Sequence, residues 1–163
     1  MLVAQHTGAD QPEQAEYAAS QTVVFTLLTG VVLGTLWFQF VAELLSVFGA
    51  EPAVLTLATD YMEVISLGLP FLFGFTVFIA LMRGAGDTVT PMLVMFGTVV
   101  LNVALDPLLI FGVGPLPELG VEGAAIATVF SRGSAMVVGL LLMFRGAHGV
   151  QINLRQMIPD LAY

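Results

Sequence analysis

The chain has 163 residues, of which 58% are hydrophobic and only 10% are charged, whereas soluble domains average about 25% charged residues. Its net charge of −8 argues against nucleic-acid binding, since phosphates need cationic partners. The chain contains no cysteine, which excludes disulfides, thiolate metal sites and cysteine nucleophiles. These features indicate an all-α integral membrane protein that lies in the lipid bilayer, with room for about four spans of roughly 20 residues each.

The first predicted element is a polar segment. Residues 1–21 carry acids and amides and lack the basic and apolar blocks of a secretory signal, so they are assigned to a cytoplasmic polar loop. The first transmembrane helix is predicted over 22–48. Gly30 and Gly34 form a GxxxG pair inside this span, and such a pair lets another helix approach closely.

Three further transmembrane helices follow in the sequence. The second is predicted over 55–82 and contains Pro70, which removes a backbone hydrogen bond and should kink the helix. The third is predicted over 90–113, with Pro107 inside it, and the fourth over 121–144. Small residues recur every four positions along the fourth span, which predicts close packing inside a bundle; they are Gly123, Ala127, Ser131, Ala135 and Gly139.

The arginine distribution predicts how the chain crosses the membrane. Residues 145–163 are polar and are assigned to a cytoplasmic tail. With four spans, Arg83, Arg145 and Arg155 lie on the same side as the N-terminus, and the opposite side carries only acids. Because basic residues concentrate on the cytoplasmic side, we predict a multi-pass protein of the plasma membrane with both termini in the cytoplasm.

A polar pair interrupts the apolar third span. Asp106 lies four residues after Asn102, so both side chains share one helix face, and a carboxylate inside the hydrocarbon costs at least about 2.5 kcal/mol. At a rise of about 1.5 Å per residue, Asp106 and Thr128 lie at similar depths, about 10 Å below the outer boundary. We therefore predict a site for Na⁺ or H⁺, with Asp106 as the binding acid and Asn102 and Thr128 as oxygen donors. No other metal or cofactor is expected.

Two neighbouring residues bear on this interpretation. Arg132 lies in the fourth span and is a possible ion-pair partner of Asp106, in a pair that would only orient two helices. Pro107 crowds the carbonyl of the residue one turn back and cannot donate a hydrogen bond to it, which leaves that oxygen available to a cation. The sequence shows no nucleophile, zinc or dinucleotide motif, so an enzyme is not expected.

Five stretches of the chain, in order, resemble the MATE (multidrug and toxic compound extrusion) transporters. The most specific stretch is MRGAGDTVTPMLVMFGTVVLNVALDPLLIFG, which continues as far as GAAIATVFSR at residue 132. The resemblance implies the third to sixth helices of the N-lobe in a twelve-helix antiporter that exchanges drug-like organic cations for Na⁺ or H⁺. It also implies that Asp106 and Asn102 match the acid and amide of the fifth helix, and that Thr128 matches a threonine of the sixth. Transport would then need the missing N-terminal helices and the C-lobe.

Two other functions remain open at this point. A related flippase that moves lipid-linked saccharides has a similar architecture, but the NxxLD and GxGDT elements argue against it. A non-transporting four-helix membrane module, either an assembly partner or a remnant, is the alternative from a different class. The flanking DNA distinguishes these possibilities, because in-frame family helices would indicate a piece of a transporter.

Overall fold

The computed structural model describes residues 12–47, 49, 51–146 and 152. Within these residues lie four helices, α2 (Pro12–Val47), α3 (Pro52–Gly84), α4 (Val89–Ile110) and α5 (Gly120–Phe144). Each helix is long and apolar enough to cross a membrane, and the described residues form no strand. The all-α fold with four apolar helices is therefore confirmed. Residues 1–11 of the predicted polar loop, and the predicted tail beyond residue 146 apart from residue 152, lie outside the described residues.

The start of α2 differs from the prediction. Residues 12–21, assigned to a polar loop, are helical, because alanine, glutamate and glutamine are good helix formers and a proline suits the first helical position. At 36 residues, α2 is about 54 Å long, which exceeds the hydrocarbon thickness of about 30 Å. Its polar first turns therefore extend beyond the apolar part of the bilayer. The other three helices begin and end within three residues of the predicted spans.

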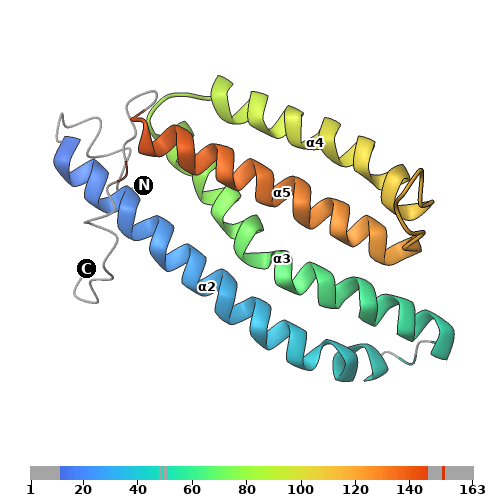
Figure 1. The fold of residues 1–163 in the computed structure, drawn as a ribbon. Helices are drawn as coiled ribbons and strands as arrows, with labels where there is room; N and C mark the ends of the chain where they lie inside the picture. Colours follow the sequence, from blue (N-terminus) through green and yellow to red (C-terminus); the bar gives the residue numbers. More distant parts are fainter. Residues whose placement is uncertain (1–11, 48, 50, 147–151, 153–163) are drawn as a thin grey trace.

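The helices lie side by side in the order α2, α3, α5, α4 (Figure 1). α2 packs against α3, α3 packs against α5, and α5 packs against α4, while α3 and α4 touch only marginally. Among the residues of α4, only Pro91 is buried. α5 therefore packs against both α3 and α4, and a space remains between those two helices.

Glycines bring α2 and α3 into backbone contact. A Cβ added at Gly30 would lie 2.8 Å from the Pro70 Cα, and one added at Gly34 would lie 2.6 Å from the Ser66 carbonyl oxygen. The GxxxG pair therefore packs against the segment of α3 that contains the internal proline. Figure 1 shows α3 bending about halfway along its length.

The small residues of α5 line its packed side. Gly123, Ala127, Ser131, Ala135 and Gly139 are all buried. A Cβ at Gly139 would meet the Phe78 ring at 2.6 Å, so α3 sits directly against the α5 backbone. The main hydrophobic core lies where α2 begins and α3 and α5 end, and it includes Phe78, Met82 and Met143.

Two connections fix the position of α4. Before it, the Asp87 Oδ1 accepts hydrogen bonds from the backbone N–H groups of Val89 (2.9 Å) and Thr90 (3.0 Å), which satisfies two of the free donors of the first turn. After it, the Leu119 N–H donates to the Leu109 carbonyl at 3.0 Å. A Cβ at Gly123 would lie 2.5 Å from that carbonyl oxygen. This contact sets the register in which the middle of α4 lies beside the middle of α5.

Candidate functional site

The candidate site begins with the polar pair of α4. The Asn102 Nδ2 donates a hydrogen bond to the Asp106 Oδ1 at 3.3 Å, and both side chains are partly buried. The helix spacing of four residues brings the amide and the carboxylate together, as the sequence predicted. Because the amide nitrogen is directed to Asp106, the amide oxygen of Asn102 is left as a hydrogen-bond acceptor.

A cavity of about 380 Å³ lies between α3, α4 and α5, and Asn102 is part of its wall. Its size is typical of a small-molecule site. Part of the lining is apolar, with Leu72 and Phe75 from α3 and Met95 from α4. The polar lining comes from all three helices and consists of Thr76, Thr98, Asn102, Thr128, Ser131 and Arg132.

The cavity brings together three of the four polar residues singled out from the sequence. Asn102, Thr128 and Arg132 line it, and Asp106 is linked to it through its hydrogen bond to Asn102. The Thr128 hydroxyl donates to the Ala124 carbonyl at 2.9 Å, so its oxygen keeps lone pairs for another donor or a cation. Within the part of the chain that the structure describes, Arg132 makes no ion pair with Asp106.

Sequence reasoning missed three hydroxyl residues of this cavity. Thr98 lies one turn before Asn102, so the spacing of four that links Asn102 to Asp106 also points to Thr98. Ser131 was assigned only to the small-residue strip of α5, although it follows Thr128 by three residues. No sequence signal indicates Thr76, because it reaches the cavity from α3.

The chemistry of the site is that of oxygen ligands around one carboxylate. No group of three or more histidine or acidic side chains among the described residues could hold a transition metal. A carboxylate, an amide oxygen and a hydroxyl oxygen suit a proton or a hard monovalent cation instead.

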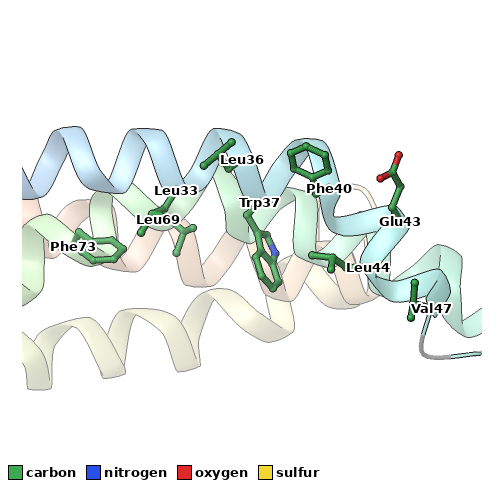
Figure 2. Close-up of a pocket in the computed structure, with 9 residues that line it drawn as sticks. All are labelled: Leu33, Leu36, Trp37, Phe40, Glu43, Leu44, Val47, Leu69 and Phe73. Atoms are coloured by element: carbon green, nitrogen blue, oxygen red, sulfur yellow. The ribbon is translucent and has the colours of Figure 1, made fainter.

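A larger groove of about 690 Å³ lies along α2 and α3, and it is almost entirely apolar. Figure 2 shows the Trp37 indole beside this groove, while the Glu43 carboxylate points away from that ring. Trp37 and Phe40 are exposed. Large exposed apolar side chains without converging polar groups are typical of a surface that faces lipid or another helix, so the polar cavity is the better site candidate.

The four apolar helices and the intramembrane polar residues define a multi-pass membrane protein. The family model described as MatE matches residues 1–108. The chain therefore belongs to the MatE (MATE) family, which confirms the resemblance found in the sequence.

Known proteins agree with this assignment. The chain is 31% identical over 153 residues to the probable multidrug resistance protein YoeA of Bacillus subtilis, an alignment that covers 94% of this chain and 33% of the relative. It is 38% identical over 124 residues to a FAD transporter of Shewanella oneidensis, covering 76% of this chain and 27% of the relative. This chain thus spans about a third of the length of such relatives.

Solved structures of MATE family transporters share the same fold. An inward-facing structure matches with a TM-score of 0.87 and 29% sequence identity, covering 99% of this chain and 36% of that protein. An outward-facing structure matches with the same TM-score and identity, covering 99% of this chain and 35% of that protein. The four helices therefore correspond to a segment of a larger transporter fold.

Proposed function

We propose that the chain forms part of an antiporter that exports drug-like organic cations in exchange for Na⁺ or H⁺. The observation that carries this proposal is the Asp106 carboxylate, held by Asn102 on an apolar helix beside a cavity that Thr128 also lines. An ionisable residue inside a membrane helix marks an ion or substrate pathway by default. Membership of the MATE family supports the same function.

Each polar residue has a separate role in this proposal. Asp106 binds the coupling ion, and Asn102 and Thr128 supply neutral oxygens that replace part of its water shell. The ion can drive export because a ligand shifts a conformational equilibrium by its difference in affinity for the two states. A carboxylate whose surroundings change between inward-facing and outward-facing states provides that difference.

The four helices act as one body in the proposed cycle. The chain is equally similar to an inward-facing and an outward-facing MATE structure, with a TM-score of 0.87 to each. This supports alternating access by rocking of whole helix bundles around a central site. The helices that match the rest of the relatives would supply the opposite wall of the substrate pathway.

The expected substrate follows from the family, and the expected location follows from charge. We assign a drug-like organic cation because the family resemblance implies it and some relatives are named as multidrug resistance proteins, while the relative named as a FAD transporter carries an anionic dinucleotide. The arginine side of the bundle is assigned to the cytoplasm, with both termini there and the protein in the plasma membrane. No catalytic role is assigned to any residue.

A chimaera tests this function. This chain replaces the matching third of the Bacillus subtilis relative, and ethidium efflux is measured in cells under an imposed Na⁺ or H⁺ gradient. Asp106→Asn should abolish gradient-driven efflux while the protein still inserts into the membrane. Asp60→Asn is the matched control, because Asp60 is exposed near the start of α3 and should leave efflux unchanged. Full efflux by Asp106→Asn would remove Asp106 from the coupling role.

A further inference from the structure

The cavity between α3, α4 and α5 contains an arginine that has no carboxylate partner among the residues the structure describes. Arg132 lies in the middle of α5 and lines the cavity, and within the described ranges it forms no ion pair or hydrogen bond. A guanidinium stays protonated in proteins. Intramembrane charges are costly and normally pair, so Arg132 favours an anionic group inside this cavity.

The residue before it also lacks a hydrogen-bond partner in the described part of the chain. Ser131 is only 1% exposed and lines the same cavity, and its hydroxyl makes no hydrogen bond to any described residue. Leaving a buried hydroxyl unpaired is unfavourable. The three threonines of the cavity differ, because Thr76, Thr98 and Thr128 each donate to a carbonyl of their own helix.

The donors that remain available decide which ligand fits. With the threonine protons used, the donors of this cavity left free among the described residues are the Arg132 guanidinium, the Ser131 hydroxyl and the second N–H of the Asn102 amide. A carboxylate accepts hydrogen bonds only, and its two oxygens match the planar guanidinium. The apolar wall at Leu72, Phe75 and Met95 can cover the hydrophobic body of the same molecule.

We propose that this cavity is a binding site for an amphipathic carboxylate, with the head group on Arg132 and Ser131 and the apolar body against α3. This cavity also contains Asn102 and Thr128, which the proposed ion coupling uses, but the head group lies on Arg132 and Ser131, which have no role in ion binding. The ligand comes either from water, as an aromatic acid, or from the bilayer, as a fatty acid. Binding can be measured without any ion gradient, so its failure is distinct from a failure of transport.

The test measures binding to the whole chain in lipid nanodiscs, with empty nanodiscs subtracted. 2-Naphthoate serves as the aromatic acid and decanoate as the fatty acid. 2-Naphthylmethylammonium and 2-naphthylmethanol carry the same ring with the opposite charge or none. We expect at least one of the two carboxylates to bind about tenfold more tightly than the amine and the alcohol, and the carboxylate that binds more tightly identifies the source.

Variants separate this site from general partitioning into lipid. Arg132→Gln should weaken carboxylate binding about tenfold and remove the preference over the amine. Arg145→Gln is the matched control, since Arg145 lies at the exposed end of α5, and it should bind like the native chain. Ser131→Ala should raise the melting temperature without ligand, because it removes an unpaired buried hydroxyl, and should weaken carboxylate binding.

Any of three results would overturn the proposal. One is equal affinity of the native chain and Arg132→Gln for both carboxylates, with far-ultraviolet circular dichroism showing the same helicity. Another is an amine that binds the native chain as tightly as the carboxylates do. Loss of binding in Arg145→Gln as well as Arg132→Gln would also reject it, because the effect would then follow total charge and not the cavity.

Discussion

Gly34 of α2 lies directly against the backbone carbonyl of Ser66 in α3, at a distance that leaves no space for a side chain. A Cβ at Gly34 would stand 2.6 Å from that oxygen. The Ser66 carbonyl lacks its helical donor because residue 70 is a proline without an N–H group. The internal proline and the GxxxG pair therefore meet at one point, where a freed carbonyl faces the neighbouring helix.

Gly34→Ala should separate α2 from α3 at this contact. Overpacking against backbone atoms costs about 1–3 kcal/mol, measured as the free energy of unfolding in bicelles by steric trapping. Gly97→Ala is the control, since a Cβ at Gly97 in α4 would have no atom within 4 Å. That change should be neutral, or stabilising by up to about 1 kcal/mol, because alanine favours helix more than glycine does. Equal effects of the two changes would show that the α2–α3 contact does not need its glycine.

Pro70→Ala should straighten α3. The new N–H can donate to the Ser66 carbonyl and restore the helical ladder across the bend. Spin labels at Thr56 and Arg83, both exposed near the ends of α3, report its length by double electron–electron resonance. The mean distance between the labels should increase in Pro70→Ala. An unchanged distance would mean that packing against α2 and α5, and not the proline, sets the bend.

The helix contacts could be predicted from the sequence because each small-residue pattern lies within a single helix. The GxxxG pair of α2 and the small-residue strip of α5 were predicted to lie at helix contacts, and the structure places them there. The helical start of α2 was missed for a physical reason. The polar composition of residues 12–21 indicates contact with water. It does not distinguish a loop from a helix that extends beyond the bilayer, because both are polar.

Only part of the candidate site could be predicted from the sequence. The spacing between Asn102 and Asp106 is a property of one helix, and the hydrogen bond between them follows from it. Thr76 could not be found in the same way, because the face that α3 turns to α4 depends on how α3 crosses α5. Glycine contacts such as that of Gly139 with Phe78 set this crossing, and a sequence does not state which side chain a glycine meets.

Gly123→Ala should disturb the register between α4 and α5. The new Cβ would lie 2.5 Å from the Leu109 carbonyl oxygen, so α4 must move away from α5, at a cost of about 1–3 kcal/mol. Gly133→Ala tests the same change in the same helix with space available, because its Cβ would meet the Phe71 ring at 3.6 Å. Thermal unfolding in detergent should show a lower melting temperature for Gly123→Ala alone. A drop of the same size for Gly133→Ala would point to loss of glycine flexibility as the cause.

Thr128→Val should weaken binding of the coupling ion with little effect on folding. Valine keeps the shape of threonine and loses the hydroxyl, whose hydrogen bond within the described ranges goes to the Ala124 carbonyl of its own helix. If the Thr128 oxygen is a ligand, the ion concentration for half-maximal efflux by the chimaera should rise about tenfold. Thr29→Val is the matched control, because Thr29 makes the same kind of bond to the Phe25 carbonyl on the exposed surface of α2. Thr128→Ser restores the oxygen and should restore the ion dependence. If Thr128→Val instead leaves that dependence unchanged, Thr128 acts only in helix packing, and the ion is held by Asp106 and Asn102 without it.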